Sequence, residues 1–199
     1  MENQYLKDIT EKCWSNFKPS KTHLHGWFDD SNIKTLNVAL ERKPKVFLEL
    51  GTWYGLSTQY ILNNSDTHLI SVDSFPDIIE DWHCKSGVDG MLKEYPLYKT
   101  FLSNFYDHKE RLTVIKGMSN DILKTLAKNN VEIDAIYLDT SHTYENTIQE
   151  IENVMNYHPN ALLTGDDYNR AECGKAIKEC AEKYNKKLIV LGKGWYYDN

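Results

Sequence analysis

Acidic residues follow several apolar stretches of this chain, where their side chains could do chemistry together. Glu49, Asp73 and Asp139 each lie within or directly after an apolar stretch, and Asp166 and Asp167 follow another. Buried charge without a partner is costly, so carboxylates gathered at one place need positive partners. A cationic ligand, a metal ion, or both would meet that need.

The first of these acids belongs to the stretch Val46–Ser57, which predicts a buried strand, a glycine loop and the start of a helix. Gly51 and Gly55 allow a tight turn and a close approach to a ligand, and Ser57 suits the first helical turn. Two glycines four residues apart do not match the pattern of nicotinamide enzymes, and Glu49 would repel a pyrophosphate. The loop favours a cationic ligand, although an ordinary glycine turn also fits.

Further along the chain, two predicted strands lead to candidate contacts for an adenosine ligand. Asp73 ends the predicted strand 68–73 and lies 22 residues after the first loop glycine. Nucleotide-binding α/β folds place a ribose-binding carboxylate at a similar spacing, although an acid capping the next turn gives the same pattern. The third strand, residues 112–115, precedes Met118 and Ser119. Met118 suits packing against a purine face, and Ser119 is either a ligand contact or a helix cap.

The next two predicted strands also end at acidic residues. The strand Ile133–Asp139 is followed by a turn that contains His142, and the strand Ala161–Thr164 leads into Asp166 and Asp167. A histidine at such a place is a catalytic candidate or a structural hydrogen-bond partner. The two aspartates could hold a ligand or cap the following helix.

The elements that must position these residues alternate regularly between strands and helices. Five alternations predict a parallel sheet with helices on both faces. Segments 187–191 and 195–197 flank a short glycine turn and predict a hairpin that adds an antiparallel strand at one end of the sheet. We therefore expect an α/β, Rossmann-like, seven-stranded and mostly parallel sheet with an antiparallel C-terminal strand. Ligands of such sheets bind at the carboxyl ends of the strands, where the acids would lie.

The chain of 199 residues fits a single domain, residues 1–199. Residues 1–43 predict an N-terminal helical cap, in which helices cover about residues 5–17 and 32–42, with Ser31 capping the second. The aromatic segment between them fits a surface loop better than a lid over the site. Residues 75–97 predict a substrate-side insertion, in which Trp82 and His83 are candidates for ligand contact.

The composition favours some classes of binding partner and some cellular compartments over others. The net charge of −6 gives no attraction to phosphate backbones, which disfavours nucleic acid and favours a small-molecule substrate. The four cysteines form no C-x-x-C pair and predict free thiols in a reducing compartment. No stretch resembles a membrane span or a signal peptide, so we expect a cytoplasmic protein without a membrane partner. The sequence leaves a homo-oligomer open.

Two motifs resemble those of class I S-adenosylmethionine-dependent methyltransferases, in the group that includes macrocin O-methyltransferase-like enzymes. They are Leu138-Asp139-Thr140-Ser141-His142-Thr143-Tyr144-Glu145 and Gly165-Asp166-Asp167-Tyr168. The glycine loop also resembles the first motif of this class, whose acid lies near the methionine end of the cofactor. The resemblance covers roughly residues 45–185 and implies S-adenosylmethionine as cofactor. The implied cofactor-binding residues are Glu49, Gly51, Gly55, Ser57, Asp73, Met118, Ser119 and Asp139.

The same resemblance implies a metal site and an acid–base group. In better understood members the motif acids hold a divalent metal, usually magnesium, so the ligands here would be Asp139, Asp166 and Asp167. Such an ion would acidify a substrate hydroxyl. The position two residues after Asp139 is acidic in some relatives but is Ser141 here. His142, whose ordinary pKa is close to neutrality, is then the expected general base, with Asp139 as the second catalytic residue.

The resulting hypothesis is methyl transfer from S-adenosylmethionine to a small molecule, most simply to a hydroxyl oxygen. It has a version assisted by Mg²⁺ and a metal-free version in which His142 or a lid residue acts alone. A protein that binds the cofactor without transferase activity is the alternative, and it would lack a pocket beside the methyl group. A nicotinamide-linked reductase fits less well, because Glu49 is present and a third glycine is missing.

Overall fold

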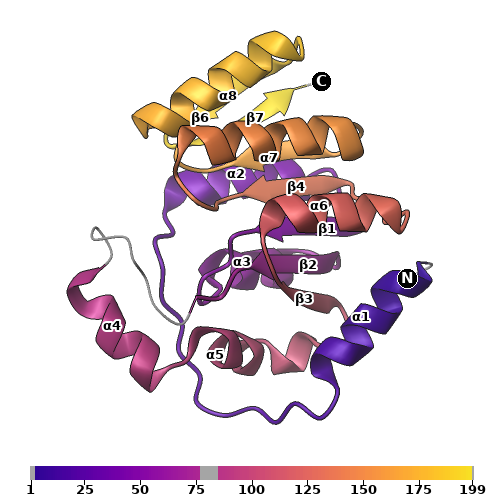
Figure 1. Cartoon of the computed structure of the whole chain (residues 1–199), viewed down its shortest axis with the longest axis vertical. Helices are drawn as coiled ribbons and strands as arrows, with labels where there is room; N and C mark the ends of the chain where they lie inside the picture. Colours follow the sequence, from indigo (N-terminus) through magenta and orange to yellow (C-terminus); the bar gives the residue numbers. More distant parts are fainter. Residues whose placement is uncertain (1–2, 77–84, 199) are drawn as a thin grey trace.

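The computed structural model describes residues 3–76 and 85–198. Their strands form one seven-stranded sheet, which is flanked by helices (Figure 1). The strand order is β3-β2-β1-β4-β5-β7-β6. The strands are β1 (Val46–Leu50), β2 (His68–Asp73), β3 (Leu112–Lys116), β4 (Ala135–Leu138), β5 (Leu162–Gly165), β6 (Lys187–Leu191) and β7 (Gly194–Asp198). The first five pair in parallel, and β7 is antiparallel to both neighbours. The predicted sheet is confirmed, with β7 one position inside the edge rather than at it.

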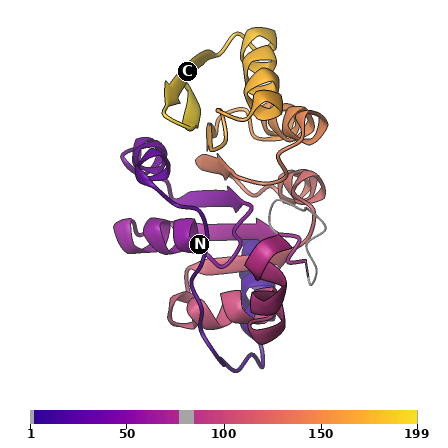
Figure 2. The same ribbon diagram turned by 90° about the vertical axis from the view of Figure 1, so that its left-hand side faces the viewer.

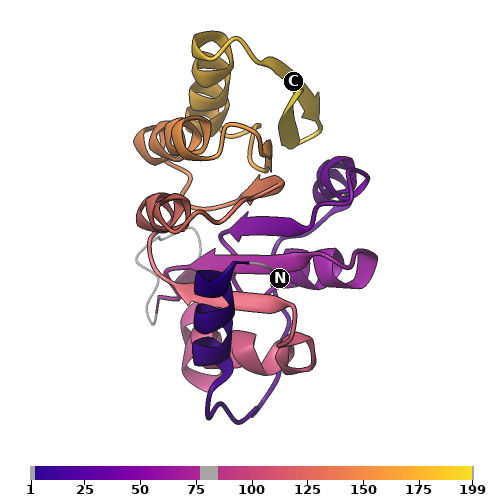
Figure 3. The same ribbon diagram turned by 90° about the vertical axis from the view of Figure 1, so that its right-hand side faces the viewer.

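Helices cover both faces of this sheet (Figure 3). They are α1 (Gln4–Trp14), α2 (Asp30–Leu40), α3 (Leu56–Asn64), α4 (Lys85–Glu94), α5 (Leu97–Asn104), α6 (Ser119–Lys128), α7 (Tyr144–Tyr157) and α8 (Ala171–Lys183), with a 3₁₀ turn at Tyr106–His108. Helices α6, α7 and α8 pack on one face, and α2 and α3 lie on the other (Figures 2 and 3). None of the helices in the described ranges has the length and apolar character that crossing a membrane requires.

Two hydrophobic cores result from this layering. Successive side chains of a strand point to opposite faces, so Leu48 and Leu50 of β1 pack under α6, α7 and α8, whereas Phe47 packs under α2 and α3. All three side chains are fully buried. The apolar stretches in the sequence are therefore strands buried on both sides, and their parallel pairing brings the acidic strand ends to one edge of the sheet.

The N-terminal helices begin and end at different residues from those predicted. Helix α2 begins at Asp30, because the Asp29 carboxylate accepts a hydrogen bond from the backbone N–H of Ser31. Ser31 is thus inside the helix and does not cap it. Helix α1 ends at Trp14, whose indole N–H donates to the Leu112 carbonyl at 2.7 Å and fastens the helix to β3.

The predicted insertion at residues 75–97 contains helix α4, which the sequence analysis did not anticipate. Its side chains Val88 and Leu92 are buried, and the Tyr54 hydroxyl donates to the Tyr95 carbonyl at 2.6 Å. This part of the insertion is packed against the body of the protein. Trp82 and His83 lie outside the described residues, so their contact with a ligand stays a prediction.

Candidate functional site

A cleft of about 870 Å³ opens at the carboxyl ends of the parallel strands. Its walls come from the loops after β1 to β5, from residues 25–28 and from the turn between β6 and β7. Open α/β sheets bind ligands at this place, and the volume is in the range of small-molecule sites. Four of the predicted acids line the cleft: Asp73, Asp139, Asp166 and Asp167.

One wall of the cleft is the aromatic segment that the sequence analysis treated as a surface loop. The Trp53 indole N–H donates to Nδ1 of His25 at 3.1 Å, and the rings of Trp27 and Trp53 have centroids 6.1 Å apart. The Trp27 side chain is 60% exposed and borders the cleft. The segment therefore contributes to the site as well as to the surface.

Glu49 is fully buried and does not line the cleft. Hydroxyl groups of Ser57, Thr58 and Ser71 donate to its carboxylate at 2.5, 2.6 and 2.8 Å. Burial raises the pKa of Glu49 to about 7, and these hydrogen bonds offset only part of that effect. Ser57 does border the cleft, so its hydroxyl lies between the buried Glu49 carboxylate and the cleft.

The two loop glycines are required by packing as well as by the turn. Their φ angles are 84° at Gly51 and 97° at Gly55, in the left-handed region that favours glycine. A Cβ at Gly51 would lie 1.7 Å from the backbone oxygen of Asp139, and one at Gly55 would lie 2.2 Å from the Phe105 ring. Gly51 borders the cleft, whereas Gly55 is buried at the start of α3. Any contact of Gly55 with a cofactor would be indirect.

Asp73 organises the two loops that follow β1 and β2. Its Oδ2 accepts from the backbone N–H groups of Thr52 and Trp53 at 2.9 and 3.0 Å, and its Oδ1 accepts from that of Phe75 at 2.7 Å. Trp53 and Phe75 have φ angles of 51° and 45°, which are uncommon for bulky residues. Oδ1 keeps a second lone pair that a ligand hydroxyl could use.

Met118 and Ser119 lie at the start of α6 with different surroundings. The Met118 side chain is 60% exposed on the cleft, so an apolar surface is free for a ligand. Ser119 is buried, and its hydroxyl donates to Glu150 of α7 instead of capping the helix. Thr140 also donates to Glu150, at 2.7 Å. Ser119 therefore ties α6 to α7 at the border of the cleft.

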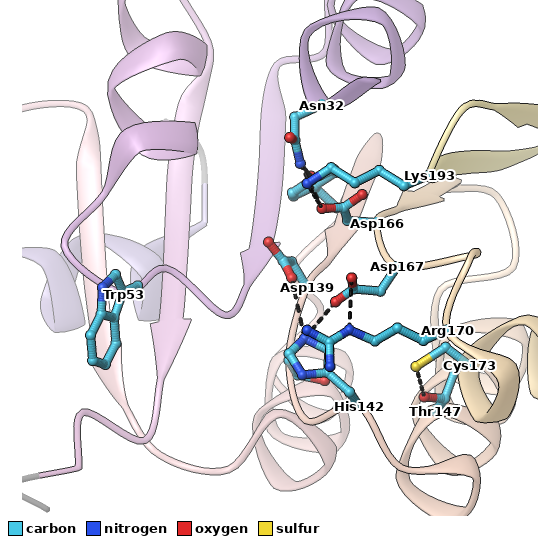
Figure 4. Close-up of polar contacts among 12 residues, drawn as sticks. Asn32, Trp53, Asp139, His142, Thr147, Asp166, Asp167, Arg170, Cys173 and Lys193 are labelled. Atoms are coloured by element: carbon cyan, nitrogen blue, oxygen red, sulfur yellow. Dashed lines mark hydrogen bonds and ion pairs between the residues drawn. The ribbon is translucent and has the colours of Figure 1, made fainter. Parts of the chain in front are cut away.

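His142 lies between two of the predicted acids (Figure 4). Its Nε2 is 2.6 Å from Asp167 Oδ2 and 3.9 Å from Asp139 Oδ1, and Arg170 Nε is 2.9 Å from Asp167 Oδ1. Burial would lower the pKa of His142, but hydrogen bonds to Asp139 and Asp167 and the charge of Asp167 raise it to about 9. The imidazole is therefore protonated at neutral pH.

The two acids around His142 respond differently to their surroundings. Burial raises the pKa of Asp139, and the neighbouring carboxylates add to that shift. Burial would also raise the pKa of Asp167, but His142 and Arg170 outweigh it and lower that pKa. Asp167 also has a φ angle of 59°, in the left-handed region that aspartate tolerates better than most residues. Ligand atoms of Asp139, His142 and Asp167 all lie within 4.8 Å of one another, so this group could hold a metal ion.

Asp166 faces different partners from Asp167, as Figure 4 shows. Its side chain is 4% exposed, and its Oδ2 accepts from Asn32 Nδ2 at 2.8 Å and lies 3.1 Å from Lys193 Nζ. Among the described residues, its Oδ1 is buried without a hydrogen-bond partner. The structure thus brings two of the three predicted metal ligands together around His142 and pairs the third with Lys193. The three-aspartate magnesium site stays a prediction.

Three residues of the site were missed by the sequence analysis: Arg170, Lys193 and Asn32. Arg170 stands three residues after Asp167 in the loop before α8, which is a weak local signal. Lys193 stands between two glycines in the predicted hairpin turn, which marks the turn but not its target. Asn32 is 134 residues from its partner Asp166, so no local pattern could have identified it.

Comparisons with known proteins place the chain in a family. The family model described as "Methyltransferase domain" matches residues 48–168, which include the glycine loop, Asp73 and both acidic motifs. No curated protein matches the chain.

Solved structures match its fold across nearly the whole length. The SAH-bound methyltransferase PaMTH1 from Podospora anserina is 14% identical, with a TM-score of 0.54 and coverage of 100% of this chain and 97% of that one. The O-methyltransferase from Bacillus cereus in complex with SAH is 16% identical, with a TM-score of 0.57 and coverage of 98% and 93%. The macrocin-like subtype stays a prediction. The fold is that of class I methyltransferases, and the chain belongs to the methyltransferase domain family.

Proposed function

We propose that this protein transfers a methyl group from S-adenosylmethionine to a hydroxyl oxygen of a small molecule. The observation that carries the proposal is one continuous cleft. It is bordered both by predicted cofactor-binding residues and by predicted catalytic residues. Gly51, Asp73 and Met118 border it on the side of β1, β2 and β3, and Asp139 and His142 border it on the side of β4. A cofactor and an acceptor can therefore lie side by side in a methyltransferase domain.

On the cofactor side, Asp73 would accept the ribose hydroxyls and Met118 would pack against the adenine. The free lone pair of Asp73 and the exposed surface of Met118 support these roles. Glu49 and Gly55 would act by shaping the loop, since neither borders the cleft. Through its hydrogen bond to Glu49, Ser57 would place negative electrostatic potential near the positively charged sulfonium.

On the acceptor side, the cofactor supplies an activated methyl group, so the protein mainly orients the acceptor and receives a proton. In this transfer the acceptor oxygen would take the methyl group from the sulfonium sulfur, and His142 would take the hydroxyl proton. With a pKa of about 9, His142 is mostly protonated at pH 7, but the minor neutral fraction is a strong base. Asp139 and Asp167 would hold the imidazole and stabilise the imidazolium that forms.

Magnesium is the second version of this proposal. A magnesium ion held by Asp139, Asp166 and Asp167 would supply positive charge that acidifies the acceptor hydroxyl. The residues fit this set only in part, because Asp166 is paired with Lys193, whereas His142 lies with the other two acids. The contribution of metal is measured directly by whether EDTA abolishes turnover and whether Asp166→Asn has the same effect.

The alternative, a protein that binds the cofactor without transferring its methyl group, would need no acceptor space. The cleft continues beyond Asp73 and Met118 to His142, Asp167 and Arg170, and this extension favours an enzyme. We also propose a cytoplasmic location, because Cys13, Cys173 and Cys180 are free thiols.

The proposal is tested by isothermal titration with S-adenosylhomocysteine, with and without Mg²⁺. We expect micromolar binding to the wild type and loss of binding in Asp73→Ala, with circular dichroism as the check on folding. Asp66→Ala is the matched control, because Asp66 is exposed and precedes β2 at the opposite end of the sheet. Absence of binding to folded wild-type protein would overturn the cofactor assignment.

A further inference from the structure

Lys193 is carried into the cleft by a turn that is closely packed on both sides. A Cβ at Gly192 would lie 2.4 Å from Ser31 Oγ, and one at Gly194 would lie 1.9 Å from Thr35 Oγ1. The turn between β6 and β7 therefore rests directly on α2. The backbone oxygen of Lys193 accepts from the Tyr168 N–H at 2.8 Å, which joins the turn to the loop after β5. These contacts leave the lysine little choice of position.

The ammonium group of Lys193 serves as the cation for Asp166. Its Nζ is 3.1 Å from Asp166 Oδ2 and 3.4 Å from Asp29 Oδ2, and the lysine side chain is only 20% exposed. Burial would lower the pKa of Lys193, but the charge of Asp166 raises it, so the group stays protonated. Asp29 is mostly exposed and contributes less. Asp166 is therefore neutralised by the protein's own side chain.

A further ligand contact is available at this pair. An ammonium has three N–H bonds, and the two carboxylates account for two of them. Lys193 and Asp166 both border the cleft that also contains His142. Asp166 Oδ1 is buried and has no hydrogen-bond partner in the part of the chain that the structure describes, and a buried carboxylate oxygen normally accepts a hydrogen bond. The pair thus has both donor and acceptor capacity beside the proposed base.

We propose that Lys193 is the built-in cation of the acceptor site, and that it occupies at Asp166 the place a divalent metal ion would take. It holds the acceptor oxygen through its remaining N–H and stabilises the negative charge that develops there. Lys193 keeps its proton throughout, and the hydroxyl proton goes to His142. This inference rests on the proposed function, because it assumes that the acceptor oxygen lies in this cleft.

The test uses Mn²⁺ alone as the probe, with free ion measured by electron paramagnetic resonance. In Lys193→Met, Asp166 loses its cation and becomes available, so we expect Mn²⁺ affinity to rise at least about tenfold over the wild type. The gain should disappear in Lys193→Met combined with Asp166→Asn. Lys193→Arg keeps the charge and should show no gain. Lys187→Met removes an exposed lysine that starts β6, and it should behave like the wild type.

Two results would overturn the inference. One is wild-type binding of Mn²⁺ that Asp166→Asn weakens about tenfold or more, because Asp166 would then already be a metal ligand. The other is Lys193→Met with no gain in affinity while circular dichroism shows a folded protein. Titration of the same variants with S-adenosylhomocysteine separates this inference from the proposed function, since failure of cofactor binding in the wild type would leave the Mn²⁺ result unaffected.

Discussion

Glu49 and the two acids after β5 lie at the same end of the sheet and have different kinds of partner. Glu49 of β1 is surrounded by three donating hydroxyl groups, and no cation among the described residues forms an ion pair with it. The acids after β5 have cations instead, since Asp166 pairs with Lys193 and Asp167 pairs with His142 and Arg170. One region stabilises a carboxylate with dipoles, and the other with full charges.

The difference teaches how much each kind of partner can do for a buried acid. Hydroxyl groups leave the pKa of Glu49 raised to about 7, because their hydrogen bonds do not repay the loss of hydration. Charged partners lower the pKa of Asp167 although burial acts against them. The Glu49 region thus favours a positively charged ligand, whereas the acids after β5 already have cationic partners within the protein.

The largest expected effect concerns His142, which pairs with an acid after β5. His142→Ala should lower turnover by about 100- to 10,000-fold, the usual contribution of a general base. Affinity for S-adenosylhomocysteine should stay unchanged, because the variant leaves Asp73 and the glycine loop intact. Turnover is measured as S-adenosylhomocysteine released with an acceptor found by screening hydroxyl compounds. His108→Ala is the control, since His108 precedes β3 at the opposite end of the sheet.

The pH dependence of turnover reports the protonation state of His142. The pKa of about 9 predicts that wild-type turnover rises with pH up to that value. Because the folded-state pKa is raised above 6.5, the stabilisation from this proton is complete below pH 6.5 and is lost as pH rises through about 9. Asp167→Asn should move both transitions to lower pH. A flat profile in the wild type would contradict the assignment of His142 as the base.

The next prediction concerns Glu49 and its effect on the stability of the fold. Since the folded-state pKa of Glu49 is raised from 4.5 to about 7, folding loses stability as pH rises between these values. The loss amounts to about 3 to 4 kcal/mol above pH 7, at roughly 1.4 kcal/mol for each pKa unit. Glu49→Gln has no ionisable group and should lack this loss. Urea unfolding at pH 5 and pH 8 measures it, and equal pH dependence in the two proteins would refute the prediction.

The smallest expected effect separates the hydroxyl partners of Glu49. Thr58→Val removes one donor and should cost about 1 kcal/mol at pH 8, where Glu49 is ionised, and less at pH 5. Unfolding in urea is again the measurement. The same change made together with Glu49→Gln gives the coupling between the two side chains. If the cost is the same in both backgrounds, the Thr58 hydroxyl does not act through the carboxylate.

Local patterns in the sequence predicted the sheet and most of the cleft's acids. The alternation of apolar stretches with helical segments requires a parallel sheet, and strand ends such as Asp73 and Asp139 must then meet at one edge. The left-handed turns at Gly51 and Gly55 were likewise local, because only glycine adopts them easily. These features depend on residues close together in the chain.

Tertiary structure alone decided which partners those acids have. The pairing of Asp166 with Asn32 and Lys193 depends on how α2 and the last hairpin pack, and no nearby residues encode it. The charge of His142 likewise comes from carboxylates that follow two different strands, because Asp139 and Asp167 raise its pKa although burial acts in the opposite direction. Sequence therefore determined where the acids lie, because periodicity and turns are local. Packing determined their charge state, because electrostatic interactions depend on distance in space and on exclusion of water.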